Sequence, residues 1–264
     1  MKSHNDLIKE QFNKQAATFG TMAGHYDALD LMVRLAQAHE KDTVLDVACG
    51  PGIVACAFAK KTAHVRGIDL VPAMIEKAKA AQEEQNLKNM SWEVGNVNPL
   101  PYAHCSYSIV VSRFAFHHFT DPLAVLKEMS RVVNWEGRVL VTDVYITSKE
   151  QSHLYDQMEK LRDPSHTRAL MLGELTDMYK EADLTITDKQ FYRLEVDVEE
   201  LLKATLTPPK EAAEFKTIVK ADIGINKIGI EAKLREEKLI FSFPVVIMVG
   251  QKQAPANYGL SACS

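Results

Sequence analysis

The segment Ser112–Pro122, which reads S-R-F-A-F-H-H-F-T-D-P, gathers three side chains that could do chemistry. His117, His118 and Asp121 are of residue types that bind transition metals, and histidine also transfers protons near neutral pH. An aspartate followed directly by a proline is equally typical of the first residues of a helix. A metal site, an acid/base site and a helix start are therefore all open until the place of the segment in the fold is known.

A second segment, D-V-A-C-G-P-G at residues 46–52, is predicted to join a buried strand to a helix. Gly50 and Gly52 allow the backbone to turn sharply and approach a ligand closely, and the following helix start offers free N–H groups. Asp69 ends the next apolar strand, where a carboxylate can accept hydrogen bonds from two ribose hydroxyls. Asp46 would repel a pyrophosphate and favours a ligand with a cationic end.

The elements that must position these side chains alternate in type along the chain. Apolar runs predict strands at residues 43–48, 65–70, 90–94, 108–112, 138–144, 184–194 and 241–250. Helical periodicity predicts helices at 5–18, 26–39, 72–86, 122–133, 148–162 and 171–182. Because the early strands are continuous Val, Ile and Leu runs, they indicate a parallel sheet buried on both faces. The chain is therefore predicted to be a doubly wound α/β fold.

Composition and charge disfavour several classes of function. The 264 residues, 46% hydrophobic and 25% charged, suit a globular protein with a substantial core. The net charge of -4 disfavours nucleic-acid binding, and no apolar run approaches the ~20 residues that span a bilayer. The N-terminal residues lack the apolar core of a signal peptide. The four cysteines form no C-x-x-C pair, so we expect a reducing, cytoplasmic location and no zinc site.

Several motifs together resemble those of class I S-adenosylmethionine-dependent methyltransferases. V-L-D-V-A-C-G-P-G (44–52) is similar to their first motif, and G-I-D-L (67–70) to their second-strand acid. G-N-V-N-P-L-P-Y (95–102) is similar to their G-D-A-x-x-L-P-F stretch, and residues 128–143 resemble their helix, turn and fifth strand. The resemblance is greatest to the UbiE-like group (methyltransferase type 11) and covers roughly residues 8–252.

This resemblance implies one Rossmann-like domain over residues 1–252, with a seven-stranded, mostly parallel sheet whose last strand is antiparallel. The expected parts are a helical N-terminal cover (5–39), a cofactor-binding core (43–146), acceptor-side helical elements including a late-insert cap (147–182 and 195–238) and a disordered tail (253–264). Phe12, Phe19 and Tyr26 would belong to the cover, although their spacing is equally typical of a core.

The resemblance also implies a role for each site residue. Gly50 and Gly52 would shape the loop around the amino-acid end of S-adenosylmethionine, Asp46 would lie beneath that end, and Asp69 would hold the ribose hydroxyls. The other residues expected to bind the cofactor are Leu70, Met74, Asn96, Val97 and Arg113. Asn96 stands where the family usually has aspartate beside the adenine. Its side-chain oxygen can still accept the adenine N–H, so we expect weaker binding rather than none.

The expected reaction is methyl transfer to a small-molecule acceptor, which leaves S-adenosylhomocysteine as product; O-, N- and C-methylation stay open, as does the oligomeric state. His117 or His118 is the candidate general base. Asp121 is predicted to cap the helix that begins at Pro122, which argues against a metal site. The two histidines are expected to point apart, with His117 toward the acceptor.

Two alternatives stay open. A protein of this fold could bind the cofactor and carry out other chemistry or regulation. G-P-G-I-V-A (50–55) also fits the G-x-G-x-x-A fingerprint of nicotinamide-dependent oxidoreductases, although no convincing Tyr-x-x-x-Lys set accompanies it.

Overall fold

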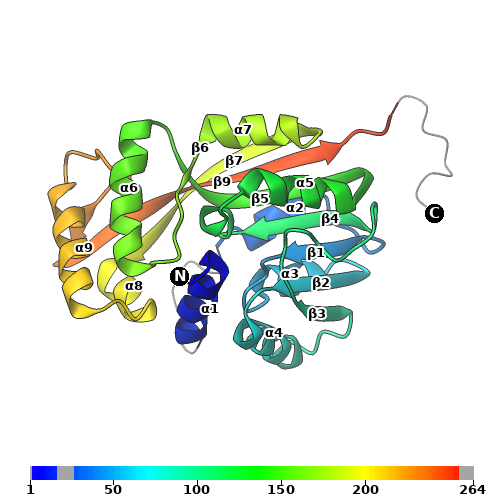
Figure 1. The fold of residues 1–264 in the computed structure, drawn as a ribbon, viewed down its shortest axis with the longest axis horizontal. Coiled ribbons are helices and arrows are strands. Elements are labelled where there is room, and N and C mark those ends of the chain that lie inside the picture. Colours follow the sequence, from blue (N-terminus) through cyan, green and yellow to red (C-terminus); the bar gives the residue numbers. More distant parts are fainter. Residues whose placement is uncertain (1, 17–26, 256–264) are drawn as a thin grey trace.

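The computed structural model describes residues 2–16 and 27–255, so the predictions for Phe19, Tyr26 and the tail from residue 256 lie outside the described residues. The main sheet runs in the order β3-β2-β1-β4-β5-β9-β7 (Figure 1). Its strands are β1 (Thr43–Val47), β2 (His64–Asp69), β3 (Met90–Val94), β4 (Tyr107–Arg113), β5 (Val133–Ile146), β7 (Leu184–Asp197) and β9 (Lys238–Lys252). β9 alone runs in the opposite direction to the other six, which confirms the predicted sheet.

Two short strands were not predicted. β6 (Leu170–Met171) pairs with β5, and β8 (Lys233–Arg235) pairs with β9.

Helices cover both faces of the sheet. α2 (Leu29–Leu35) and α3 (Ile53–Ala59) pack on one face with α4 (Pro72–Glu84) beside α3, and α5 (Pro122–Val132) and α7 (Leu172–Glu181) pack on the other. Neighbouring residues of β4 face opposite layers: Val110 joins the α5 and α7 cluster, and Ile109 joins the α2 and α3 cluster. This two-sided burial explains why the strands are continuous apolar runs.

A second core lies beyond the end of the parallel strands. β5, β7 and β9 have 14, 14 and 15 residues, against five to seven in β1 to β4, and their extensions carry α6 (Lys149–Arg162), α8 (Val198–Ala204) and α9 (Pro209–Ala221) (Figure 1). Tyr155, Leu201, Phe215 and Phe241 are among its buried residues. After the roles that the sequence resemblance implies, and as names for positions only, we call this part the acceptor half and the parallel part the cofactor half.

Helix α1 (His4–Gln15) lies between the two halves (Figure 1). Ile8 and Phe12 pack against Val71 and Met74 of the cofactor half, and the Gln11 amide donates to the Arg162 carbonyl at the end of α6, 3.5 Å away. Within the part of the chain that the structure describes, no helix is long and apolar enough to cross a membrane.

The start of α5 settles the role of Asp121. Its Oδ1 accepts the N–H of Ala124 at 3.0 Å, and Pro122 is the first helical residue, so the predicted cap is confirmed. Among the described residues, no three His, Cys, Asp or Glu side chains are arranged to hold a metal ion.

Candidate active site

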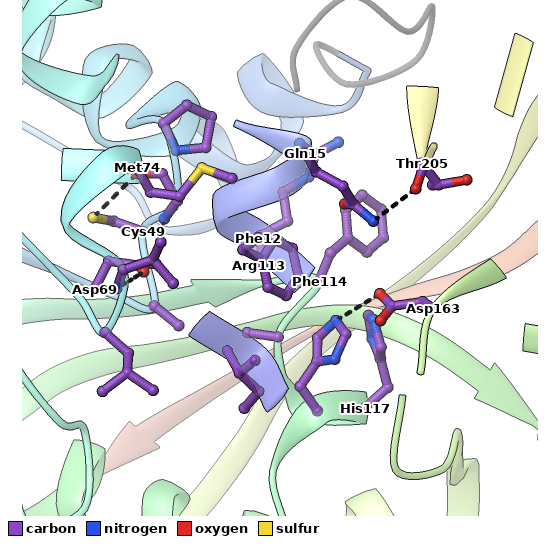
Figure 2. Close-up of a pocket in the computed structure, with 18 of the residues that line it drawn as sticks. Phe12, Gln15, Cys49, Asp69, Met74, Arg113, Phe114, His117, Asp163 and Thr205 are labelled. Atoms are coloured by element: carbon purple, nitrogen blue, oxygen red, sulfur yellow. Dashed lines mark hydrogen bonds and ion pairs between the residues drawn. The ribbon is translucent and has the colours of Figure 1, made fainter. Parts of the chain in front are cut away.

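A cavity of ≈ 240 Å³ opens at the carboxyl ends of β1, β2 and β4. Figure 2 shows Cys49, Asp69 and Met74 on one side of it, and His117, Asp163 and Thr205 on the other. Phe12 and Gln15 reach it from α1. Because the edge of a parallel sheet where loops meet helix starts is where open α/β folds bind ligands, this cavity is the candidate site.

The two glycines of the first turn differ in their roles. Gly50 lines the cavity and has φ +51°, and a Cβ there would meet no atom within 4 Å, so its backbone conformation alone favours glycine. Gly52 has φ +78°, and a Cβ there would lie 2.6 Å from the ring of Trp92 and 2.9 Å from Ala78. Gly52 therefore lets the start of α3 approach β3 and α4, which fixes the loop that Gly50 presents.

Asp69 ends β2 at the cavity wall. Its Oδ2 accepts the N–H of Gly50 at 2.8 Å and its Oδ1 accepts that of Val71 at 2.9 Å. Burial raises the pKa of Asp69, although both N–H groups oppose the shift by favouring the ionised form. Each carboxylate oxygen keeps a lone pair for a ligand hydroxyl, so the predicted ribose contact fits this geometry.

Asp46 lies beneath the loop and not on the cavity wall. Its carboxylate accepts the N–H of Ala55 at 3.0 Å, and the side chain is almost fully buried. Burial raises the pKa of Asp46 to about 8, and the charge of Asp69 adds to the shift. Two desolvated carboxyl groups favour a neighbouring cation. Asp46 and Asp69 therefore fit a ligand with a sulfonium and an ammonium group.

Replacement of Asp46 by asparagine is expected to remove the pH dependence of cofactor binding. A cationic ligand favours ionised Asp46, so we expect the affinity of the wild-type protein for S-adenosylmethionine, the cofactor that the sequence resemblance implies, to rise as the pH approaches about 8. The stability of the ligand-free protein is expected to follow the opposite trend. The pKa of Asp46 in the folded protein, about 8, exceeds the reference value of 3.8, so the stability falls as the pH rises from 3.8 to about 8. Isothermal titration and thermal unfolding across this range measure both trends, with Asp177→Asn on an exposed helix face as control; a flat affinity profile for the wild type would contradict the linkage.

Four other predicted residues, Leu70, Met74, Asn96 and Val97, also line the cavity. Met74 and Val97 are buried, and Asn96 is exposed. The Asn96 Oδ1 accepts the N–H of Asn98 at 3.2 Å. Its second lone pair is still available to an adenine amino group.

Arg113, the last residue of β4, lines the cavity as well. Its Nη2 donates to the Asp27 carbonyl at 3.1 Å, and its guanidinium lies 4.5 Å from the centre of the Phe114 ring. Arg113 therefore links this part of the cavity wall to the chain segment that precedes α2.

His117 and Asp143 form a largely buried pair at the cavity, with 11% and 2% of their side chains exposed. The His117 Nδ1 lies 2.6 Å from the Asp143 Oδ1, and the other carboxylate oxygen accepts the N–H of Phe116 at 2.7 Å. Burial disfavours charged His117, but the charge and hydrogen bond of Asp143 outweigh it and raise the pKa of His117. Because Nδ1 is hydrogen-bonded to Asp143, Nε2 is the ring nitrogen that remains available to a ligand in the cavity.

His118 has a different environment. Its Nδ1 lies 3.1 Å from the Ser165 carbonyl and its Nε2 lies 3.8 Å from Asp163. Burial, together with the charge of His117, lowers the pKa of His118 to about 3, so this ring is neutral at physiological pH. Phe12 of α1 packs edge-on against it, with ring centres 5.1 Å apart.

The expectation that the two histidines point apart is wrong. Both line the cavity, and their ring centres are 4.2 Å apart. Phe116–His118 forms a single turn of 3₁₀ helix rather than an extended loop, so successive side chains lie roughly 120° apart instead of on opposite sides.

Three residues of α6 were missed by the sequence analysis. Tyr155, Glu159 and Arg162 all line the cavity and, at positions i, i+4 and i+7, share one helix face. The polar composition of α6 predicts a solvated helix, and only this spacing of polar side chains could have indicated a buried polar face.

Comparisons with known proteins agree with this geometry. A protein family described as a methyltransferase domain matches residues 38–204. The chain is also 30% identical over 190 residues to the uncharacterized methyltransferase YcgJ of Bacillus subtilis, covering 72% of this chain and 75% of that protein. The chain belongs to the class I S-adenosylmethionine-dependent methyltransferases. This confirms the predicted family and enzyme class (EC 2.1.1.-) and sets aside a nicotinamide-dependent oxidoreductase.

This methyltransferase is also similar to solved structures and to a further relative. The crystal structure of YcgJ matches it with a TM-score of 0.81 and 26% identity, covering 88% of this chain and all of that one. The ubiquinone/menaquinone biosynthesis C-methyltransferase UbiE of Bdellovibrio bacteriovorus is 30% identical over 154 residues, which are 54% of this chain and 65% of that protein. The [4+2]-cyclase SpnF shares the fold, with a TM-score of 0.66, 16% identity and coverage of 95% and 94% of the two chains.

Proposed function

We propose that this methyltransferase transfers a methyl group from S-adenosylmethionine to a small, largely apolar metabolite whose nucleophile must lose a proton, such as a hydroxyl. The observation that carries the proposal is the buried His117–Asp143 pair at the wall of the cavity. A histidine held by a carboxylate is a general base that works near neutral pH.

The cofactor half has the groups to hold S-adenosylmethionine. Asp69 would accept the ribose hydroxyls, the loop at Gly50 would surround the amino-acid end, and Met74 and Val97 would contact the adenine. When bound, the cofactor supplies a methyl group on a positively charged sulfur that is already a good leaving group, and S-adenosylhomocysteine remains. The protein therefore needs chiefly to align the nucleophile and to remove its proton.

The acceptor half supports both tasks. The His117 Nε2 would take the proton of the acceptor, and the charge of Asp143 would stabilise the imidazolium that results. The ring orientation is fixed because Asp143 is itself held by the N–H groups of Phe116 and Val144. Phe12 of α1 lies over the neighbouring His118 and would keep water from the reacting atoms.

Cofactor-dependent chemistry other than methyl transfer is the alternative. SpnF shows that another activity occurs on this fold, but the likeness to it extends to the fold alone. A cytoplasmic location also remains part of the proposal, and the free thiols of Cys49, Cys56 and Cys105 support it.

Transfer of a labelled methyl group tests the proposed function. The protein is incubated with methyl-tritiated S-adenosylmethionine and a cell extract filtered to remove macromolecules. We expect label in small, organic-extractable products that requires the wild-type protein and is lost with His117→Ala. Binding of S-adenosylhomocysteine in a thermal-shift assay without any transfer of label would contradict methyl transfer and favour the alternative.

A further inference from the structure

Tyr155 has a buried hydroxyl with no partner. The side chain is fully buried on the inner face of α6 and lines the cavity, and no hydrogen bond to its oxygen forms within the part of the chain that the structure describes. Buried polar groups almost always have a hydrogen-bond partner. Because Tyr155 lines the cavity, its unsatisfied hydroxyl points to a ligand atom as the missing partner.

Arg162 lies on the same face of α6, about two turns beyond Tyr155, and its guanidinium is also a hydrogen-bond donor. Its Nε donates to the Glu159 Oε1 at 3.1 Å and its Nη2 pairs with the other carboxylate oxygen. Among the described residues its Nη1 has no hydrogen-bond acceptor, although the side chain is largely buried at the cavity. Tyr155 and Arg162 thus both present hydrogen-bond donors, and a ligand atom between them must be an acceptor.

The charge of the surroundings restricts the ligand further. Arg162 is already neutralised by Glu159, and the carboxylates of Asp143 and Asp163 are also buried nearby. A ligand carboxylate or phosphate at Tyr155 and Arg162 would be desolvated among these negative groups, and Arg162 could not offset its charge because Glu159 already pairs with it. Apolar side chains also line the cavity, among them Phe114, Leu194, Val196 and Leu201, and the Phe243 ring lies beside Arg162, with its centre 5.6 Å from the guanidinium.

We propose that Tyr155 and Arg162 form a polar anchor for the methyl acceptor. The anchor binds a carbonyl oxygen of an uncharged acceptor, and the apolar body of the acceptor lies against the apolar side chains of the cavity. This oxygen is distinct from the nucleophile at His117, so the substrate class is an apolar hydroxy-ketone or a related hydroxy-carbonyl compound. The assignment of the nucleophile rests on the proposed function, whereas the anchor rests on Tyr155 and Arg162 alone.

Thermal unfolding of two tyrosine variants separates a ligand contact from a structural role. Tyr155→Phe removes a hydroxyl that bonds to none of the residues that the structure describes, so the melting temperature should stay equal or rise. Tyr179→Phe is the matched control because Tyr179 is equally buried, and its hydroxyl donates to the Met248 carbonyl at 2.9 Å and accepts the Val141 N–H at 3.1 Å. We expect the control to lower the melting temperature by about 2–6 °C. An equal loss in both variants would overturn the anchor.

Binding of three shape-matched phenols to the protein saturated with S-adenosylhomocysteine tests the ligand class. The probes are 4′-hydroxyacetophenone, 4-isopropylphenol, which lacks the carbonyl, and 4-hydroxybenzoate, which is charged. We expect the wild type to bind the ketone about 10-fold more tightly than the alkylphenol and to bind the benzoate most weakly. Tyr155→Phe should reduce the affinity for the ketone to that for the alkylphenol.

The outcomes distinguish the anchor from the proposed function. Equal affinity for ketone and alkylphenol, retention of the preference in Tyr155→Phe, tightest binding of the benzoate, or no binding of any probe would each overturn the anchor. The affinity for S-adenosylhomocysteine, measured first in both proteins, reports on the cofactor half alone. Failure to bind S-adenosylhomocysteine would count against the proposed function and not against the ligand contact of Tyr155. In that case the three phenols test the Tyr155 contact in the cofactor-free protein.

Discussion

Replacement of His117 by alanine is expected to lower the turnover number by about 10²–10⁴-fold and to leave the affinity for S-adenosylhomocysteine unchanged. The variant removes the Nε2 that would accept the proton, whereas Asp69 and the loop at Gly50 remain intact. Initial rates with the labelled cofactor and isothermal titration with the product measure the two quantities. His104→Ala, on an exposed loop outside the cavity, is the control. Turnover equal to that of the control would remove His117 from the mechanism.

The pH profile adds a readout that a structural role would not affect. A general base must be neutral before the reaction, so activity should rise with pH through the raised pKa of His117. Asp143→Asn removes the carboxylate charge that offsets the burial of His117, so the pKa of His117 should fall. The rise in activity should then occur at lower pH, and the maximal rate should decrease. His118 does not confuse this profile because its pKa of about 3 keeps it neutral throughout. An unshifted profile in Asp143→Asn would show that the pair does not set the base.

Replacement of Asp69 by alanine is expected to weaken the binding of S-adenosylmethionine by roughly 30- to 1000-fold. Two hydrogen bonds from ribose hydroxyls to a carboxylate are lost, at about 1–2 kcal/mol each, and the loop loses the contact between Asp69 and the Gly50 N–H. Isothermal titration measures the affinity, with Asp177→Ala as an exposed control. Thermal unfolding of the ligand-free variant checks that the loss is not a general failure to fold. Affinity within twofold of the control would mean that Asp69 does not hold the ribose.

The cofactor half was predictable because its signals are local. Gly50 and Asp69 belong to consecutive strand–turn–helix units, and parallel strands must bring their carboxyl ends to one edge. The cap of α5 was predictable for the same reason, since Asp121 and Pro122 are adjacent. The separate role of Gly52 was not, because Trp92, the side chain that excludes a Cβ there, lies forty residues further along the chain.

The acceptor half depends on contacts that sequence periodicity does not encode. The sequence of α6 is typical of a solvent-exposed polar helix. One of its faces is buried because α6 packs with α9 and the extended part of β9 in the second core. The paired histidines depend on a single 3₁₀ turn. Asp143 could be placed at the correct sheet edge from the sequence, but its hydrogen bond to His117 joins residues 26 positions apart and required the structure.

The lengths of β5, β7 and β9 have a consequence for how accurately the reactants can be aligned. These strands continue from the cofactor half into the acceptor half, so the loops and helices that form the two walls of the cavity are supported by one hydrogen-bonded sheet. In-line displacement at a methyl carbon tolerates little misplacement of nucleophile and leaving group. A sheet that supports both walls keeps that spacing constant from one turnover to the next, whereas a separate domain on a flexible linker would have to restore it each time it closed.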